Sequence, residues 1–188
     1  MEDLLKNALD ENETLLWSGR PENFEVFDKT NKKCFVKKAV IAAIVSVLLI
    51  GAYALMSVPN GNFKFIIVVI ILVFAGYSPL NVLMDANKLK KKIGYAITDK
   101  RLLTVLDSAK GIPYSAIDCA ALRTDEDGHV TLLCGPDALN SKPGDWRAFT
   151  VIGAYMDDSG EKCDRYAMYA LPDAERVKAI LKPYLNIE

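Results

Sequence analysis

Two uncharged apolar segments near the start of the chain constrain its fold more than any other feature. They are Ala39–Val58 and Phe65–Met84, and neither contains Asp, Glu, Lys, Arg or His across its 20 residues. As an α-helix, each segment would be about 30 Å long, the thickness of the hydrocarbon core of a bilayer. The link between them, Pro59–Lys64, contains Pro, Asn and Gly, which favour a reversal of the chain. The pattern predicts a transmembrane helical hairpin.

Lysines flank this hairpin unevenly. The link carries only Lys64, whereas both outer flanks are rich in lysine. Because short Lys-rich flanks stay in the cytoplasm, we expect a multi-pass plasma-membrane protein with both termini cytoplasmic. No charged residue interrupts either segment, which argues against an ion or proton path. The flanking lysines are Lys29, Lys32, Lys33, Lys37 and Lys38 before the hairpin, and Lys88, Lys90, Lys91 and Lys92 after it.

The rest of the 188-residue chain has room for one ordinary domain. We divide the chain into a cytoplasmic N-terminal segment at 1–38, the hairpin at 39–84, with helices at 39–58 and 65–84, and a folded domain at 93–188. The net charge of −1 gives no basis for nucleic-acid binding, which needs a basic surface. The lipid bilayer is therefore the first expected partner.

The N-terminal segment carries two signals. The spacing of Leu4, Leu5, Ala8 and Leu9 is that of a short amphipathic helix. The stretch Glu13–Pro21, ETLLWSGRP, predicts an extended piece followed by a turn. Its aromatic residues leave two possibilities open, since amphipathic aromatic side chains collect at membrane interfaces but also pack in domain cores. The residues concerned are Trp17, Phe24 and Phe27.

After the hairpin, short runs of aromatic and β-branched residues alternate with turn residues. They predict about six strands in a small antiparallel barrel or sandwich. The predicted strands are Tyr95–Thr98, Arg101–Leu106, Ile112–Thr124, His129–Cys134, Trp146–Tyr155 and Cys163–Leu171. A polar loop is expected at Gly135–Asp145, and turns at Asp125–Gly128 and Asp157–Lys162.

The chain then changes to a helical period. Pro172 and Asp173 favour a helix start, and Pro183 limits the helix to about three turns. One stripe of this helix is apolar and must be buried, so we expect the helix to close one end of the strand assembly. The stripe consists of Val177, Ile180, Leu181 and Tyr184.

Three of these stretches together resemble the bacterial pleckstrin-homology (PH)-like domains. They are Tyr95–Leu103 (YAITDKRLL), Ile112–Ile117 (IPYSAI) and Leu171–Leu181 (LPDAERVKAIL). Members of that family often read Tyr-x-(Ile/Leu/Val)-Thr-(Asn/Asp)-x-Arg at the first hairpin, and many are attached to one or two membrane helices. The stretch ETLLWSGRP also looks like the opening of such proteins. The long loop and acidic turn from Gly135 to Lys162 depart from the family pattern.

The resemblance implies an α+β fold, in which the two-helix transmembrane hairpin is followed by a small antiparallel PH-like β-barrel capped by a C-terminal α-helix. The family barrel has seven strands and is bent. The resemblance implies no defined activity and no cofactor. A phosphoinositide pocket is not favoured, because the first hairpin turn offers only Lys100 and Arg101. We expect Arg101 to be structural and to pair with Asp99 or a loop carbonyl.

The best candidate site is a basic surface for anionic lipid. Lys88, Lys90, Lys91 and Lys92 directly follow a predicted membrane helix, where anionic lipids attract lysines by about 1 kcal/mol each. The alternative is that these lysines only fix the membrane topology, and the same lysine can both fix the topology and contact lipid.

Catalytic and metal-binding patterns are weak. No GxSxG, HExxH, Walker or GxGxxG motif occurs. His129 stands alone at a strand start and is expected to be exposed, and the acidic run at Asp125–Gly128 lacks the ligand spacing of an EF-hand. The cysteines lack metal-ligand spacing and are expected to be scattered small apolar residues, so neither a metal nor a cofactor is expected. They are Cys34, Cys119, Cys134 and Cys163.

These observations favour a membrane-anchored, non-enzymatic module that binds or scaffolds a protein or peptide at the cytoplasmic membrane face. A sheet edge, or the groove beside the closing helix, would be the contact site. The alternatives are an anionic-lipid-responsive module and a membrane enzyme with an unrecognised site. The sequence leaves open the identity of the protein partner and whether the chain forms a homo-oligomer.

Overall fold

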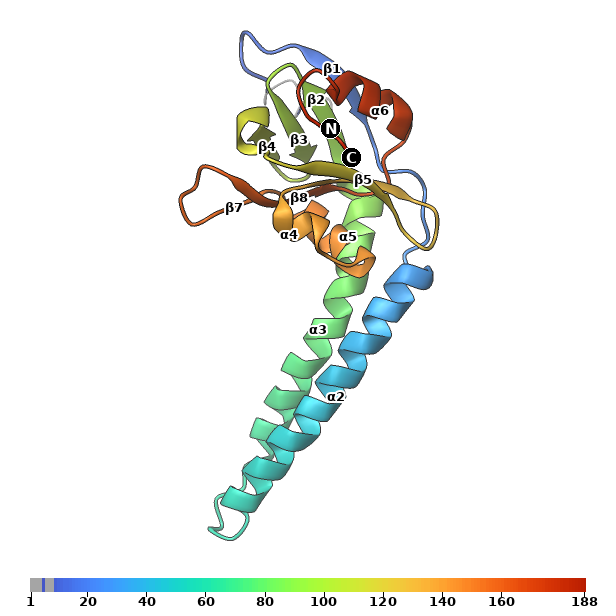
Figure 1. Ribbon diagram of the computed structural model, residues 1–188. Helices are drawn as coiled ribbons and strands as arrows, with labels where there is room; N and C mark the ends of the chain where they lie inside the picture. Colours follow the sequence, from blue (N-terminus) through green and yellow to red (C-terminus); the bar gives the residue numbers. More distant parts are fainter. Residues whose placement is uncertain (1–4, 6–8) are drawn as a thin grey trace.

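The computed structural model of the protein describes residue 5 and residues 9–188, and it consists of a two-helix rod attached to a folded domain (Figure 1). The rod is formed by α2 (Lys29–Ser57) and α3 (Phe65–Lys92), which contact each other along their length. Both are long and apolar enough to cross a membrane, and only 6% and 11% of their most apolar windows are buried. Neither helix is therefore the core helix of the domain, which is compatible with a membrane hairpin.

Both helices extend beyond the apolar segments that predicted them. The first begins at Lys29 rather than Ala39, and the second continues past Met84 to Lys92. The extensions carry the flanking lysines and reach the domain, where α5 (Pro143–Ile152) packs against both helices. Lysine and asparagine are tolerated in a helix, so hydrophobicity alone could not mark these ends.

The first sheet is antiparallel and has the order β1-β2-β3-β4. Its strands are β1 (Leu15–Gly19), β2 (Gly94–Thr98), β3 (Arg101–Val105) and β4 (Ala109–Pro113). The strands predicted from the motif YAITDKRLL are thus confirmed. The extended piece predicted at Glu13–Pro21 is also confirmed, and it pairs with β2, so the sheet joins segments from both sides of the hairpin.

The second sheet is also antiparallel, with the order β5-β6-β8-β7. Its strands are β5 (Ala120–Thr124), β6 (Val130–Cys134), β8 (Cys163–Met168) and the two-residue β7 (Tyr155–Met156). The strand predicted at His129–Cys134 is confirmed from Val130 onward, and the strand predicted at Cys163–Leu171 is confirmed up to Met168.

The two sheets are not closed into a barrel. The predicted strand Ile112–Thr124 is interrupted by the 3-10 helix η1 (Tyr114–Ala116), which follows Pro113. The next strand, β5, pairs with β6 on one side. On its other side it meets the C-terminal residues, with Ile187 bridging to Ala120 and Glu188 bonding to Ala120 and Leu122. The chain end therefore occupies an edge that a closed barrel would use.

The predicted strand Trp146–Tyr155 is wrong, because most of it forms the helix α5. Pro143 lies in the first turn of this helix, and Gly153, with φ of +86°, follows its last residue. Trp146 and Thr150 are buried one helical turn apart, which is the helical period. The residues Phe149–Ile152 favour a strand by intrinsic preference, and packing against α3 overrides that preference. The predicted loop before it contains the short helix α4 (Pro136–Leu139).

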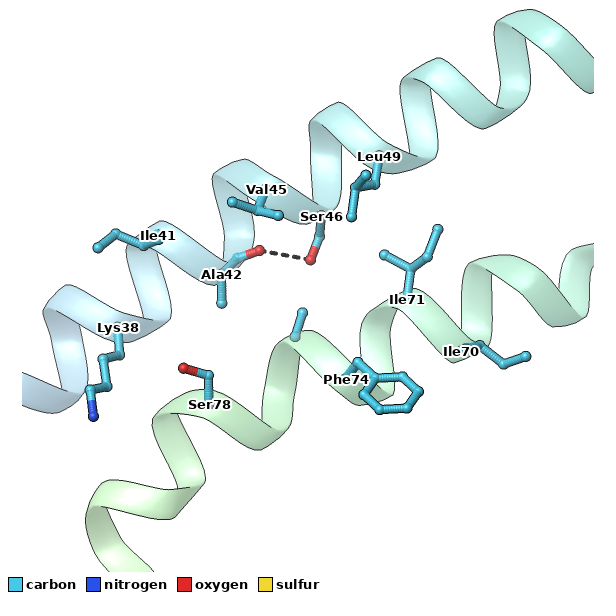
Figure 2. A pocket seen from close by; sticks show the side chains of 11 residues that line it. Lys38, Ile41, Ala42, Val45, Ser46, Leu49, Ile70, Ile71, Phe74 and Ser78 are labelled. Carbon is cyan, nitrogen blue, oxygen red and sulfur yellow. Dashed lines mark hydrogen bonds between the residues drawn. The ribbon is translucent and has the colours of Figure 1, made fainter. Parts of the chain in front are cut away.

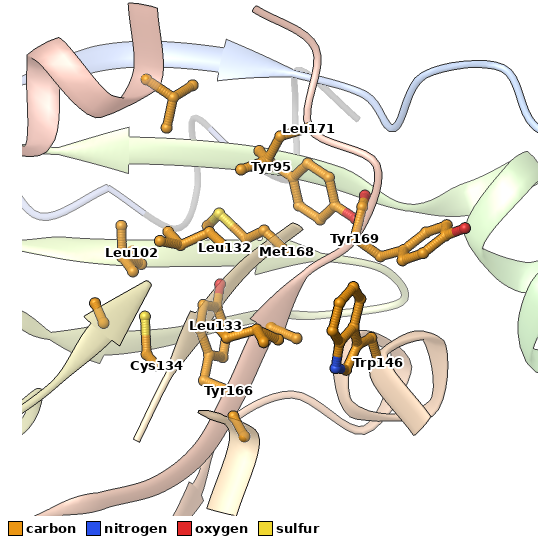
Figure 3. Packing of buried hydrophobic residues seen from close by; sticks show 14 of the residues in the cluster. Tyr95, Leu102, Leu132, Leu133, Cys134, Trp146, Tyr166, Met168, Tyr169 and Leu171 are labelled. Atoms are coloured by element: carbon orange, nitrogen blue, oxygen red, sulfur yellow. The ribbon is translucent and has the colours of Figure 1, made fainter. Parts of the chain in front are cut away.

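Both sheets contribute side chains to one hydrophobic core (Figure 3). The closing helix α6 (Ala174–Leu181) buries Val177 and Leu181 in this core, as predicted. Ile180 is only partly buried, and the prediction is wrong for Tyr184, which lies beyond the helix and is 38% exposed. Trp17 and Phe24 are core residues, so they pack on the domain. Phe27 is 49% exposed and contacts Phe35.

The amphipathic helix predicted at Leu4–Leu9 lies mostly outside the described residues. Leu5 is buried beside Ala96, Leu103 and Val105, and Leu9 packs against the same cluster. This cluster is separate from the main core, and it covers residues of β2 and β3.

The packing of α6 gives a stability prediction. Leu181→Asp should lower the free energy of unfolding by more than about 2–5 kcal/mol, since it removes a buried side chain and buries a charge. Ile180→Asp should cost less, and Ala179→Asp, at an exposed position, should be mild. Fluorescence of Trp17 and Trp146, the only tryptophans, reports unfolding of the domain in the full chain. Equal losses at positions 179 and 181 would contradict the packing.

Candidate functional site

The predicted lipid-binding lysines lie on the last turns of α3, and all four are exposed. Ala86 and Leu89 on the same turns are fully buried against the domain. At about 100° per residue, Lys88, Lys91 and Lys92 share one side of the helix and Lys90 projects elsewhere. The structure therefore brings together three of the four lysines. Lys92 also lies 3.8 Å from Asp107 in a solvent-exposed ion pair.

The two sequence motifs on either side of the hairpin meet at a bidentate ion pair. Arg101 donates from Nε to Glu13 Oε1 at 2.8 Å and from Nη2 to Glu13 Oε2 at 2.7 Å. Thr98 Oγ1 also donates to Glu13, at 2.7 Å. Arg101 is thus structural, as expected, but its partner is Glu13, while Asp99 accepts a bond from the Thr14 amide. Sequence spacing could not reveal a pair separated by the whole hairpin.

This ion pair changes the acidity of Glu13. Hydrogen bonds from Arg101 are the largest cause, and they lower the pKa of Glu13 to about 2 although partial burial opposes them. A carboxylate with a lowered pKa stabilises the folded state above its ordinary pKa, and that contribution is lost as the pH falls towards about 2.

The outer edge of β1 borders a groove of about 370 Å³. The groove is lined by β1 itself and by Pro172, Asp173 and Arg176 from the start of α6. A Cβ at Gly19 would come within 2.6 Å of the Trp17 ring and 3.3 Å of Pro172, so glycine leaves room here for the buried Trp17 side chain. The arrangement places an unpaired strand edge beside a helix, which suits the addition of an extended peptide.

The other three sheet edges carry features that oppose strand addition. The β5 edge is bonded to the C-terminal residues. The β4 edge contains Lys110, Gly111 and Pro113, and β7 has only two residues. Lysine, proline, short strands and covering segments are the usual protections of a sheet edge. The β1 edge has one such feature, a register shift between Leu15 and Trp17 in its pairing with β2. It contains no lysine or proline, and within residues 9–188 no segment pairs with its outer side.

The start of α2 is held by the turn between β5 and β6. Asp28 caps the helix by accepting from the Asn31 amide at 2.9 Å. Asp127, from the turn, accepts from the Lys29 and Thr30 amides at 3.2 and 2.9 Å and from the Thr30 hydroxyl at 2.7 Å. The predicted acidic turn is confirmed, and it serves as a helix cap.

The end of α3 is also attached closely to the domain. Only the buried Ile93 separates α3 from β2.

A buried polar network lies beside this junction. The Arg147 guanidinium, from α5, donates to Asp28 and to the Tyr169 hydroxyl. Its central carbon also lies 5.0 Å from the centre of the Phe24 ring and 4.6 Å from that of Tyr169. Its Nε and Nη1 atoms find no acceptor among the described residues, and the two aromatic faces stabilise the cation in their place.

His129 belongs to the same network and is partly buried, not exposed as predicted. The Tyr169 hydroxyl lies 2.7 Å from Asp125 Oδ2 and 3.1 Å from His129 Nδ1. Burial raises the pKa of Tyr169 well above its ordinary value. The Tyr169 hydroxyl thus links Arg147 to Asp125, and since Arg147 also bonds Asp28 before α2, the network joins the hairpin to the domain.

The cysteines are free, and Cys134 and Cys163 are buried in the core. Burial raises the pKa of Cys163 to about 12, which keeps its thiol protonated and unreactive. Over the part of the chain that the structure describes, no three His, Cys, Asp or Glu side chains are grouped to hold a metal ion.

Comparisons of this chain with protein-family models, with curated proteins and with solved structures gave no match.

The Glu13–Arg101 pair predicts a pH-dependent stability difference. Glu13→Gln should lower the stability of the full chain in detergent by about 1.5–3 kcal/mol at neutral pH, the range for hydrogen bonds to charged groups. Because the contribution is lost between the ordinary pKa of 4.5 and the lowered value of about 2, the gap between wild type and variant should shrink near pH 2. Tryptophan fluorescence during denaturation measures this stability gap. Glu11→Gln, at an exposed neighbouring position, is the control and should show no gap. A gap as large at pH 2 as at pH 7 would contradict the pairing.

The exposed lysines predict an effect of bilayer charge. Acylation of Lys88 and Lys91 in the reconstituted protein should be slower in anionic than in neutral bilayers at low salt. The difference should vanish near 1 M salt, where the Debye length is about 3 Å. The control is Lys182, which directly follows α6 and should label equally in both bilayers. The helix α6 lies at the end of the domain away from the hairpin (Figure 1). Equal labelling of Lys88 in both bilayers would refute lipid contact.

Proposed function

We propose that the protein is a membrane-anchored, non-enzymatic docking module that binds an extended segment of a partner protein along β1. The single observation that carries the proposal is the free β1 edge beside the groove of about 370 Å³. Backbone bonds to a strand edge supply affinity, and the groove wall supplies selectivity. Arg176 on that wall forms no ion pair among the described residues, so an acidic side chain in the partner segment would complement it.

The hairpin is proposed to span the plasma membrane, with both termini cytoplasmic, and so to hold the docking site near the inner membrane surface. The lysine distribution supports this orientation. We also propose that the domain is PH-like. Two four-stranded antiparallel sheets followed by a core-packed helix are compatible with that relationship, although the sheets are open.

A second candidate function is favoured by the exposed lysines at the end of α3. An anionic-lipid-responsive module would use them to sense the charge of the membrane surface. Four lysines contribute about 4 kcal/mol at most, so this contact is weak and salt-sensitive. It therefore suits modulation of the docking module more than a primary binding activity.

The docking proposal predicts a defined footprint. Peptides selected from a display library on the full chain in nanodiscs should slow hydrogen exchange of the β1 amides, because they add as a strand. Leu15→Asp or Arg176→Glu should weaken such a peptide by about tenfold, the effect of about 1.4 kcal/mol. Arg123→Glu is the matched control, since it makes the same charge reversal on β5, whose edge is covered.

Two results would overturn the docking proposal. One is a set of selected peptides that leave the β1 amides exchanging at the unliganded rate. The other is an equal loss of affinity in Arg123→Glu and Arg176→Glu, which would indicate diffuse attraction to the domain.

A further inference from the structure

A groove of about 640 Å³ runs along one side of the hairpin between α2 and α3 (Figure 2). Its walls are apolar side chains, including Ile41, Val45 and Leu49 from α2 and Phe74 from α3. Its end nearer the domain is polar, with Lys38 and Ser78 on facing helices. The groove is therefore amphiphilic along its length.

Small residues at the helix contact create this groove. Ala42, Ser46 and Ala75 line it at the seam where the helices meet, and the Ser46 hydroxyl bonds the Ala42 carbonyl at 2.7 Å within its own helix. Phe74 is 74% exposed, so it stands out from the seam and forms a wall. Close helix contact at small residues, with bulky residues at the flank, leaves an apolar trough open to the bilayer.

The length of the groove distinguishes its possible occupants. From Lys38 to Leu49 the helix rises about 16 Å, close to the depth of one leaflet, which is half of the hydrocarbon core. A lipid acyl chain from one leaflet fits this length, whereas a transmembrane helix of a partner would run along the whole hairpin.

The charge at the polar end of the groove indicates which class of lipid headgroup would bind there. Lys38 directly precedes the apolar segment, so its ammonium group reaches the depth of lipid headgroups. It forms no ion pair within the described part of the chain, although the acidic Asp85 lies near this end of the hairpin. An ammonium group at this depth complements a phosphate-bearing anionic headgroup.

We propose that this groove is a binding site for an anionic phospholipid of the leaflet on the domain side. One acyl chain lies between α2 and α3, and the headgroup contacts Lys38. The site is distinct from the exposed lysines on α3, which form no part of the groove. The inference rests on the membrane insertion of the hairpin, but not on peptide docking at β1.

The test uses the full chain in nanodiscs of equimolar phosphatidylglycerol and phosphatidylcholine. Native mass spectrometry of the protein released from them measures which lipid stays bound. The wild type should retain phosphatidylglycerol in preference to phosphatidylcholine. Lys38→Gln should reduce that preference about fivefold, the effect of one lysine contact with anionic lipid. Ser78→Phe should fill the groove and reduce retention of both lipids.

Two matched variants separate the groove from general effects. Lys91→Gln removes an equal charge on the exposed face of α3, and Ala52→Phe adds an equal ring at an exposed position outside the groove. Both should retain lipid as the wild type does. The proposal is overturned if Lys91→Gln reduces the preference as much as Lys38→Gln, if Ala52→Phe matches Ser78→Phe, or if the inserted wild type retains no lipid.

Extraction by alkaline carbonate distinguishes the absence of a lipid site from the absence of membrane insertion. A chain that carbonate removes from membranes was never inserted, and the proposed function would then fail together with the groove. A chain that resists extraction but retains no lipid leaves the anchor intact and refutes the lipid site alone.

Discussion

The pairing of β1 with β2 is the constraint on which the rest of the structure depends. These neighbouring strands are separated in sequence by both long helices, so the sheet forms only if the hairpin returns the chain to its starting point. The bidentate contact between Glu13 and Arg101 fixes the end of this pairing. Once β1 is in place, Trp17 enters the core and its outer edge becomes the border of the groove beside α6.

Residues around the junction make the hairpin and the domain one unit. Arg147 is buried, and its charge is balanced by Asp28 at the start of α2 and by two aromatic rings. Removing either partner of a buried charged pair leaves the other uncompensated, which typically costs about 3–5 kcal/mol. The network joins Asp28 before α2, Arg147 in α5 and Tyr169, the residue after β8. It could therefore form only after these three segments had assembled.

Local patterns in the sequence were sufficient for some elements. The hairpin helices follow from two uncharged apolar segments, and the strands of YAITDKRLL follow from aromatic and β-branched residues. The buried Val177 and Leu181 of α6 follow from their helical spacing. The strand predicted at Trp146–Tyr155 was wrong because Phe149–Ile152 prefer a strand intrinsically, whereas packing of α5 against α3 and β8 favours a helix. The predicted barrel failed for a related reason, since the C-terminal residues compete for the β5 edge.

The candidate site was predictable in part. The exposure of the lysines on α3 follows from their charge, and the expected contact surface was either a sheet edge or the groove beside the closing helix. Which edge is free could not be predicted, because it depends on what covers the other three. Likewise, the partner of Arg101 and the burial of His129 arise from contacts between distant segments, for which spacing gives no signal.

The junction at Ile93 has a mechanical consequence. A domain on a long flexible linker swivels freely, and its binding surface faces every direction in turn. Here one buried residue joins α3 to β2, and Asp127 holds the first turn of α2, so two separate attachments prevent that rotation. The β1 edge therefore keeps a constant heading relative to the hairpin axis. If the hairpin spans a bilayer as proposed, a tilt imposed by a thinner bilayer would turn the groove beside β1 through the same angle.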